Sequence, residues 1–352
     1  MFVAETKPAS SPAARTESPG PANPWKLIVE PVEPFLEAVA QGLARQVDAF
    51  DPALQPYAEY ALKGNGKHLR PALVALSANA VGKLNEDHVR VAVIIEMVHL
   101  ATLVHDDVMD EAEIRRGRLT LASNWGNDIA VLFGDCLFAH ALRLAASFPT
   151  PEICRAVSSA TNTVCSGEIL QNRNRANFEL SRSEYFRIME MKTAELFALS
   201  CDLAALLAGA TPAQRTAMRR FGMAFGTAYQ IFDDCLDLFG TEAQAGKSLG
   251  TDLVKGKMTL PLLILRERAS ESERAQLEQL LTNWQPGSLP EIVGLLRQYG
   301  SWSPSQETIH QYLDIARRCV VELPDVEGQE TLIKLAGYLE EQVTALGAGF
   351  HG

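Results

Sequence analysis

The sequence carries one acidic pattern twice, and each copy ends a run of apolar residues that is typical of a buried helix. In the first copy, Asp106, Asp107 and Asp110 follow the apolar residues 89–104. On a helix this i, i+4 spacing places Asp106 and Asp110 on one face, about one turn apart. Because like charges so placed repel each other, we expect a positive partner beside them. The chain must therefore fold so that buried helices carry carboxylates into the interior.

The second copy has the same spacing, with Asp233, Asp234 and Asp237 at the end of another apolar run. One such cluster alone is equally consistent with a solvated helix end. Mg²⁺ is usually held by one or two carboxylates together with substrate phosphates and water. Two clusters with identical spacing, each on a core helix, therefore predict a multi-metal diphosphate site with the clusters facing each other across a cavity.

Composition places the chain among ordinary globular proteins and excludes some partners. Hydrophobic residues make up 47% and charged residues 21% of its 352 residues, enough apolar sequence to bury a large core. The net charge of -11 argues against a nucleic-acid partner, since phosphate backbones select basic surfaces. The cysteines lack C-x-x-C spacing, which indicates reduced core residues and a cytoplasmic location. We expect neither a secretory signal nor a transmembrane helix.

The pattern from Trp25 onward is helix after helix, with no strand series. Residues 1–24, rich in Pro, Ala and Ser, predict a disordered tail, and residues 25–352 a single all-α domain. Pro and Gly residues predict a loop-rich region at 285–304. Helices are expected at 34–50, 71–81, 87–104, 129–147, 151–171, 183–207, 212–239, 260–267, 270–281, 308–322 and 329–346.

Basic segments accompany the carboxylates. GNGKHLRP, residues 64–71, opens a helix with Lys67 and Arg70 near its start, where free backbone N–H groups attract phosphate. A plain surface turn is the alternative. The segment at 245–261 carries Lys247, Lys255 and Lys257 among glycines. Its spacing does not match a P-loop and no strand precedes it, so it favours a lysine-bearing lid over phosphates.

Taken together, these motifs resemble those of the trans-type polyprenyl diphosphate synthases of the isoprenoid synthase class. The matching segments are GNGKHLRP, EMVHLATLVHDDVMD followed by RRG, the Gly167-Glu168 pair, MKTA, YQIFDDCLD and GKSLGTDLVKGK, in the expected order over residues 60–261. The sequence departs from the commonest form at Asn65 and His68, where glycine and arginine are more usual. The resemblance implies the isoprenoid synthase fold, a single-domain bundle of about ten or more mostly antiparallel helices around a deep central cavity.

The resemblance also implies roles for individual residues. The enzyme would be an Mg²⁺-dependent prenyltransferase that condenses isopentenyl diphosphate with an allylic diphosphate, with three metal ions and Mn²⁺ as a substitute. Metal ligands would be Asp106, Asp110 and Asp233. Catalytic residues would be Asp106, Asp107, Asp110, Asp233, Asp234, Lys192 and Lys247. The isopentenyl diphosphate would bind Lys67, Arg70, His99 and Arg116. The allylic diphosphate would bind Arg115, Lys192, Thr193, Gln230, Lys247 and Lys257. Alone, His99 is more often a core histidine than a ligand, and His105 has no assigned role.

Product length depends on the side chains that precede the first acidic cluster. Short-chain members of the resembled family place bulky aromatic residues there, whereas this chain has Ala101 and Thr102. We therefore expect the product tunnel to pass beyond them toward Val98 and to give a long-chain product, such as a quinone side-chain precursor. A bulky residue on a facing helix, such as Phe138 or Leu142, would end the tunnel earlier.

Alternative functions remain open at this point. A short-chain farnesyl or geranylgeranyl diphosphate synthase and a non-catalytic prenyl-diphosphate-binding partner subunit are the alternatives. A terpene cyclase is disfavoured because a second DDxxD replaces its usual second metal motif. The resemblance implies a homodimer and leaves open a peripheral membrane contact for product release.

Overall fold

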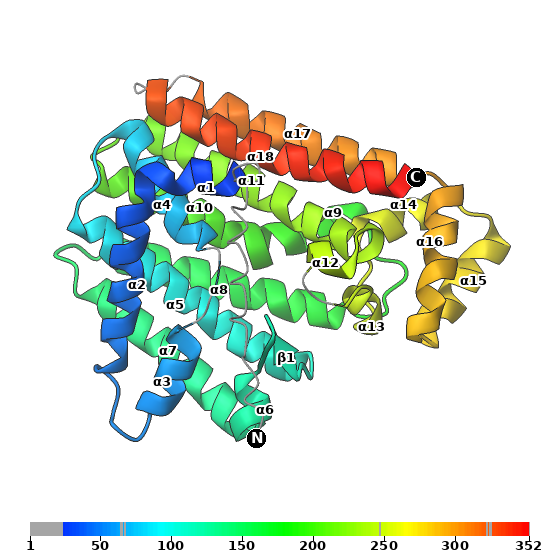
Figure 1. Cartoon of the computed structure of the whole chain (residues 1–352), viewed down its shortest axis with the longest axis horizontal. Coiled ribbons are helices and arrows are strands. Elements are labelled where there is room, and N and C mark those ends of the chain that lie inside the picture. The colour runs from blue at the N-terminus through cyan, green and yellow to red at the C-terminus, as the bar shows by residue number, and fades with distance from the viewer. Residues whose placement is uncertain are drawn as a thin grey trace, which may run out of the picture.

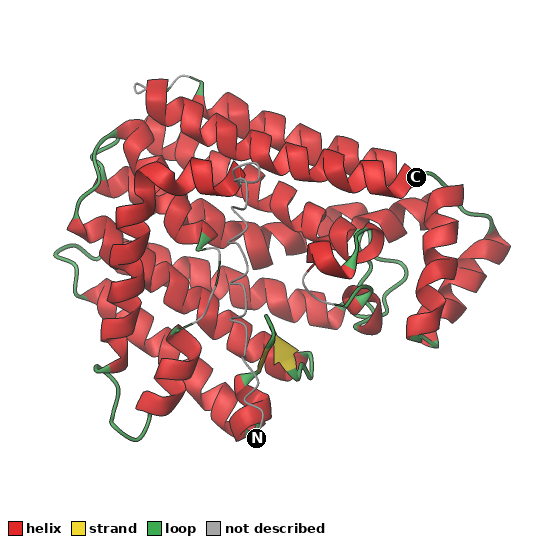
Figure 2. Ribbon diagram, in the orientation of Figure 1, coloured by secondary structure: helices red, strands yellow, loops and turns green. Residues whose placement is uncertain are grey.

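The computed structural model describes residues 24–351, apart from residues 64–65, 67, 246–247, 322 and 324–325. Figure 1 and Figure 2 show helices along nearly all of this part of the chain, which confirms the all-α prediction. The predicted tail at residues 1–24 lies outside the described residues except for Pro24, where the first helix begins.

The helices, in chain order, are α1 Pro24–Val29, η1 Glu30–Val32, α2 Glu33–Val47, α3 Gln55–Leu62, α4 Leu69–Val81, α5 Glu86–Met109, α6 Leu121–Trp125, α7 Asn127–Ala146, α8 Glu152–Arg173, α9 Arg182–Met189, η2 Glu190–Ala194, α10 Glu195–Leu207, α11 Pro212–Phe239, α12 Glu242–Ala245, α13 Thr251–Val254, α14 Leu260–Arg268, α15 Glu271–Thr282, η3 Pro286–Ser288, α16 Leu289–Gln298, α17 Trp302–Val320 and α18 Val326–His351. Two short strands, β1 Ile114–Arg115 and β2 Arg118–Leu119, form an antiparallel hairpin.

The long helices pack in layers around α5, α10 and α11. Helix α11 packs against α10 on one side and α17 on another, and α5 packs against α7. In Figure 1, α17 and α18 run side by side along one face of the molecule, while α15 and α16 project at one end. The C-terminal ends of α5 and α11, where the aspartates lie, are both inside this bundle.

Local sequence explains where the two aspartate-bearing helices begin. Thr211 and Gln214 form a capping box at the start of α11, with Pro212 in its first turn, and Asn85 and His88 form another at the start of α5. Such caps satisfy backbone N–H groups that would otherwise lack partners. Both helices are thus fixed at the end opposite to their carboxylates.

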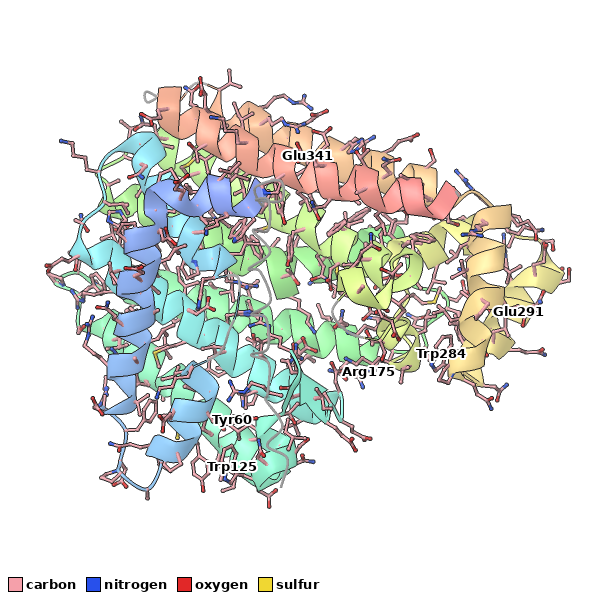
Figure 3. The ribbon with its side chains drawn as sticks, in the orientation of Figure 1. Tyr60, Trp125, Arg175, Trp284, Glu291 and Glu341 are labelled. Carbon is pink, nitrogen blue, oxygen red and sulfur yellow. The ribbon has the colours of Figure 1, made fainter. Side chains whose placement is uncertain are left out.

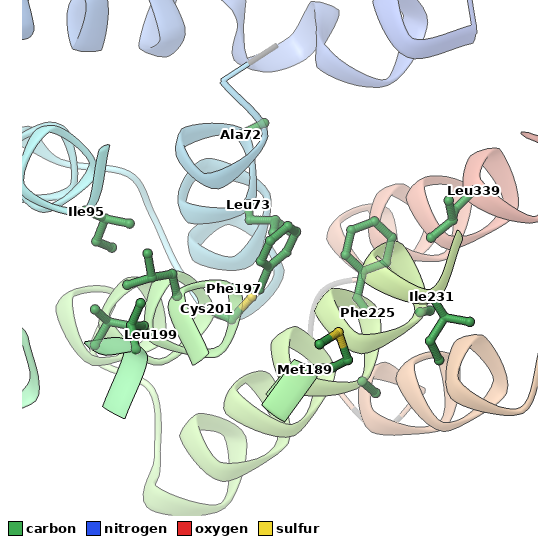
Figure 4. Close-up of a cluster of buried hydrophobic side chains, with 14 of the residues drawn as sticks. Ala72, Leu73, Ile95, Met189, Phe197, Leu199, Cys201, Phe225, Ile231 and Leu339 are labelled. Atoms are coloured by element: carbon green, nitrogen blue, oxygen red, sulfur yellow. The ribbon is translucent and has the colours of Figure 1, made fainter. Parts of the chain in front are cut away.

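The core between the helices is apolar and closely packed. Figure 4 shows Leu73 of α4, Phe197 of α10, Phe225 of α11 and Leu339 of α18 gathered in one buried cluster. Burying each such side chain stabilises the fold by roughly 1.5–3 kcal/mol. Glycine at 222 allows the close approach of α10, since a Cβ there would lie 2.5 Å from the carbonyl oxygen of Phe197.

Two sequence-based expectations are corrected. Helix α16 spans Leu289–Gln298 within the region predicted as loop-rich, because its amphipathic pattern buries Ile292 and Leu296 despite the flanking Pro and Gly residues. Helix α5 continues to Met109, beyond the predicted end at residue 104, so Asp106 and Asp107 are themselves helical.

Helix α7 is the one helix in the described part of the chain that is long and apolar enough to cross a membrane by length and composition alone. Core helices of globular proteins pass the same test. Two large apolar side chains on this helix are exposed, Val131 and Leu132.

Candidate active site

A single cavity of about 970 Å³ reaches both acidic clusters. Asp106 and Asp110 enter its wall from the end of α5, and Asp233 enters from α11. The volume is at the upper end of the usual range for small-molecule sites, about 300–1,000 Å³. The predicted arrangement, two clusters that face one shared space, is therefore what the fold produces.

In the first cluster, two of the carboxylates each have one basic partner. Asp106 Oδ2 lies 3.7 Å from the Lys192 ammonium, and Asp107 accepts a hydrogen bond of 2.6 Å from Nε of Arg115. Burial raises the pKa of Asp107 although Arg115 opposes the shift. Asp107 is not part of the cavity wall, so its arginine is the contact that the structure gives it.

Asp110 is held more tightly, because a different cation takes each of its oxygens. Oδ1 is 2.7 Å from Nη2 of Arg175, and Oδ2 is 2.5 Å from the Lys255 ammonium. Burial works against ionisation of this carboxyl, yet the hydrogen bond from Lys255 and the charges of Lys257 and Lys192 keep its pKa below the ordinary value. The positive partner expected for the i, i+4 pair is thus present.

In the second cluster, Asp234 and Asp237 accept hydrogen bonds from neutral groups. Asp234 accepts hydrogen bonds from the Tyr185 hydroxyl at 2.6 Å and from the Gln230 amide at 2.8 Å. Burial, with the nearby charge of Asp252, raises the pKa of Asp234 to about 8. Asp237 accepts from the Thr251 hydroxyl at 2.8 Å and from the backbone N–H of Asp252 at 3.0 Å. Asp237 thereby holds the first turn of α13.

The segment that carries Lys192 and Thr193 is a π-helical turn, η2, between α9 and α10. Such turns are frequent at functional sites because they re-aim side chains within a helix. Lys192 pairs with Glu168 and donates a 2.7 Å hydrogen bond to Gln171. Thr193 donates a 2.9 Å hydrogen bond to Gln230.

Glycine at 167 explains part of the Gly167-Glu168 motif. A Cβ at Gly167 would lie 2.7 Å from the backbone nitrogen of Lys192, so only glycine lets α8 approach η2 this closely. This approach brings Glu168 beside Lys192. Burial and the charge of Asp106 raise the pKa of Glu168, although Lys192 opposes the shift.

A positively charged part of the cavity wall lies next to α4. Arg70, His99 and Arg116 all line the cavity there, and the Arg70 guanidinium lies 4.8 Å from the centroid of the Phe197 ring. The Nε atom of Arg70 is buried without a hydrogen-bond partner. Burial, together with the positive charges of Arg70 and Arg116, lowers the pKa of His99 well below its ordinary value. Converging cations of this kind suit a phosphate group.

The remaining predicted ligands are placed as follows. Arg115, Lys257, Thr193 and Gln230 line the cavity. Lys257 pairs with Asp252 at 3.2 Å; burial works against its charged form, but Asp252 and Asp110 raise its pKa overall. Lys67 and Lys247 lie outside the described residues, and their roles stay predictions.

The predicted chain-length residues divide into two pairs. Thr102 and Phe138 line the cavity. Ala101 and Val98 are buried and are not among the lining residues, because they lie on the side of α5 that packs into the core. Apolar side chains of α7 and α8 also line the cavity, namely Val131, Phe138, Val164 and Ile169.

The donor set fits Mg²⁺ only if a substrate shares the ion. Within the described residues, no group of three or more Asp, Glu, His or Cys side chains is placed to hold a metal alone. The carboxylates lie on both sides of one cavity and do not form a complete coordination shell by themselves. Mg²⁺ binds to such sites when phosphate oxygens and water complete its shell.

Sequence reasoning missed Arg175, and it placed Lys255 in a lid over phosphates without pairing it with Asp110. Arg175 follows α8 in a polar segment without a recognisable motif, and it reaches Asp110 only through the fold. No signal in the sequence pairs it with an aspartate so far away. Tyr185, which contacts Asp234, was missed for the same reason.

Comparison with known proteins gives consistent matches. A family model described as Polyprenyl synthetase matches residues 51–295. The octaprenyl diphosphate synthase of Haemophilus influenzae is 32% identical over 86% of this chain and 93% of its own length. The heptaprenyl diphosphate synthase component 2 of Geobacillus stearothermophilus is 35% identical over 86% and 94%. A solved structure of a decaprenyl diphosphate synthase from Rhodobacter capsulatus superposes with a TM-score of 0.85 at 31% identity, covering 91% of this chain and 99% of that one.

Proposed function

This chain belongs to the polyprenyl synthetase family of prenyltransferases, and from that premise we propose that it joins isopentenyl diphosphate to an allylic diphosphate. The reaction proposed is repeated head-to-tail trans elongation to a long-chain polyprenyl diphosphate. The observation that carries this proposal is the single cavity that Asp106, Asp110 and Asp233 share with a separate basic wall around Arg70. Condensation needs two diphosphate sites, and the cavity offers two differently charged regions.

The region around Arg70, His99 and Arg116 suits a diphosphate that binds through arginines without metal, and we assign isopentenyl diphosphate to it. Burial is the main cause of the depressed pKa of His99, and the charges of Arg70 and Arg116 lower it further; a bound diphosphate would offset those two charges. The allylic diphosphate then belongs between the two acidic clusters, beside Lys192 and Lys257. Lys67 and Lys247 remain proposed contributors to these sites.

We propose Mg²⁺ ions, three in number, as the cofactor, with Asp106, Asp110 and Asp233 as ligands and Mn²⁺ as a substitute. When bound, the ions would supply Lewis-acid stabilisation of the charge that develops on the leaving diphosphate. Lys192, already oriented by Gln171 and Glu168, adds a fixed positive charge at the same place.

The protein's remaining work is to orient the reactants and to exclude water. The apolar residues of α5, α7 and α8 give the allylic chain a dry wall, which protects a carbocation from hydrolysis. Thr193 and Gln230 form a hydrogen-bonded pair at the cavity wall and hold one polar surface near the reacting carbons. Asp107 and Asp234, which contact Arg115 and Tyr185, position those neighbours and do not themselves line this cavity.

The long-chain assignment rests on the cavity wall beyond the carboxylates. Thr102, one turn before Asp106 on α5, is small, and Phe138 and Val164 line the same cavity from α7 and α8. No Phe, Tyr or Trp side chain of α5 lines the cavity, so this helix leaves room for a growing chain. The relatives named for heptaprenyl and octaprenyl products are consistent with this length.

The test is incubation with isopentenyl diphosphate, Mg²⁺ and a series of allylic primers, with product length read by chromatography. We expect one long polyprenyl diphosphate as the main product. A main product of farnesyl or geranylgeranyl length would overturn the long-chain assignment, and no product with any primer would overturn prenyl transfer by this chain alone.

Two variants test which side of α5 faces the product tunnel. Thr102→Phe should shorten the product sharply because Thr102 lines the cavity. Ala101→Phe, on the adjacent but buried position, should shorten it only if the tunnel reaches that side of α5. An unchanged product in both variants would remove this part of α5 from the assignment of chain length.

We further propose a homodimer that covers the exposed apolar residues Val131 and Leu132 of α7 and Ile169 of α8. Light scattering of the purified chain tests this, and a monomer at working concentration would contradict it. The free cysteines of the described chain are consistent with the proposed cytoplasmic location.

A further inference from the structure

Cations from two separate loops take both carboxylate oxygens of Asp110. Arg175, after α8, lies 2.7 Å from Oδ1, and Lys255, after α13, lies 2.5 Å from Oδ2. The Asp110 side chain is only 8% exposed. The Lys192 ammonium lies farther from Asp106, at 3.7 Å from its Oδ2.

The two loops that supply these cations are joined to each other. The backbone N–H of Ala176 donates a 2.7 Å hydrogen bond to the carbonyl of Gly256, and both residues have left-handed backbone angles, φ 54° and φ 63°. A Cβ at Gly256 would lie 3.0 Å from the nitrogen of Ala176. Figure 3 marks Arg175 beside the segment that carries α13. The loops therefore meet at Asp110 as one unit.

Arg175 has contacts that hold it near the cluster without saturating it. Nη1 lies 3.4 Å from the carbonyl oxygen of Met109, and Nε is buried without a hydrogen-bond partner. A guanidinium presents five donors in a planar fork. Arg175 thus keeps donor capacity that its carboxylate partner does not use.

A divalent ion that binds Asp110 must compete with these two cations and is repelled by both at short range. A diphosphate would offset this repulsion, because its negative charge attracts the divalent ion as well as Arg175 and Lys255. We propose that Arg175 is an internal counter-charge for Asp110, which makes metal binding at the first cluster depend on the diphosphate. This inference rests on the proposed function, because it assumes that metal and diphosphate share the cavity.

The proposal has a direct energetic consequence. If Arg175 is removed, Asp110 keeps one cation instead of two, so a metal ion alone should bind more tightly. The factor by which the diphosphate improves metal binding should then fall, and by reciprocity the metal should improve diphosphate binding less. If Arg175 only supported the structure of the site, its removal would damage the site and weaken binding of the metal ion.

The experiment titrates Mn²⁺ into full-length protein, with free Mn²⁺ measured by electron paramagnetic resonance, first alone and then with inorganic pyrophosphate. We expect Arg175→Gln to bind Mn²⁺ alone about five-fold or more tightly than the wild type, with the pyrophosphate effect reduced by a similar factor. Arg175→Lys keeps the charge and should behave like the wild type.

Arg173→Gln is the matched control, since Arg173 lies on α8 two positions earlier and is exposed. It should leave both titrations unchanged. Lys255→Gln provides an independent variant and should tighten binding of Mn²⁺ alone in the same direction. The proposal is overturned if Mn²⁺ alone binds to Arg175→Gln and Lys255→Gln as it does to the wild type, or more weakly.

The outcome separates this proposal from the proposed function. A wild type that makes polyprenyl product while Arg175→Gln titrates normally would overturn the counter-charge alone. The expected titrations in a protein that yields no product with any primer would overturn the proposed function and keep the counter-charge.

Discussion

The two acidic clusters have the same spacing in sequence, but different groups donate to their second and third aspartates in the structure. Around the first cluster the partners are cations: Arg115 for Asp107, and Arg175 with Lys255 for Asp110. The second has neutral donors, with Tyr185 on Asp234 and the start of α13 on Asp237. The same pattern of residues is thus held by cations at the end of α5, whereas at the end of α11 Asp234 and Asp237 contact Tyr185 and the start of α13.

Protonation depends on the position within the pattern as well. Burial raises the pKa of both middle aspartates, Asp107 and Asp234, the latter to about 8, whereas the pKa of Asp110 lies below its ordinary value. Asp233 is the residue of the second cluster that lines the large cavity. The two clusters therefore make unequal contributions, and we expect their variants to fail in different ways.

Replacing a cavity-lining aspartate should have the largest effect. Asp106→Asn and Asp233→Asn keep the shape of the side chain and remove its charge, so turnover should fall roughly 10²- to 10³-fold. Steady-state assays with labelled isopentenyl diphosphate measure the loss. Asp237→Asn is the control, because Asp237 does not line the cavity, and it should retain far more activity. Equal losses of turnover in all the variants would mean that the cavity-lining aspartates contribute no more to the reaction than Asp237 does.

The pH dependence of stability, measured without metal, should separate the clusters next. The folded pKa of Asp234 is raised to about 8, above the unfolded value of about 3.9, so the folded state binds the extra proton between these values. Stability therefore falls as pH rises through this window, by on the order of 1 kcal/mol per pH unit. Asp234→Asn should flatten the slope of the unfolding free energy between pH 5 and 8.

Asp110 should give the opposite sign. Its folded pKa is depressed, so its contribution is present above the unfolded value and is lost as pH falls through the folded value. Denaturant titrations of Asp110→Asn should differ from the wild type least at acid pH. An unfolding free energy of the wild type that stays constant between pH 5 and 8 would contradict the raised pKa of Asp234.

Truncating Asp237 should lower the stability of the fold more than it lowers turnover. Asp237→Ala leaves the Thr251 hydroxyl and the Asp252 N–H without their acceptor, at a cost of about 1–3 kcal/mol. Urea unfolding measures the change. Because α13 leads into the loop of Lys255 and Lys257, the Michaelis constant for the allylic substrate should rise as well. An unchanged unfolding midpoint would mean that Asp237 does not hold α13.

Tyr185→Phe should have the smallest effect in this series. It removes one neutral hydrogen bond to Asp234, which is worth about 1 kcal/mol on average, and leaves the cavity wall unchanged. Thermal unfolding should show a small decrease in melting temperature with nearly normal turnover. A large loss of turnover with normal stability would assign Tyr185 a direct part in the reaction.

Much of the fold was accessible from local patterns. The predicted span of α11 agrees with the structure at both ends, because its capping box, Pro212 and the terminal glycine are signals within the helix itself. The prediction failed at α16, where burial of Ile292 and Leu296 outweighs the local Pro and Gly signals. Amphipathic helices without clear caps are recognised only once their partner surface is known.

The sequence by itself determined that two helices end in equally spaced carboxylates, because helical periodicity and end signals act over a few residues. Which carboxylates face the cavity was decided by tertiary packing. So was the identity of their partners, since Arg175 and Lys255 lie 65 and 145 residues from Asp110. Contacts over such separations depend on how the whole bundle packs, and ion pairs inside it depend on burial that no local pattern encodes.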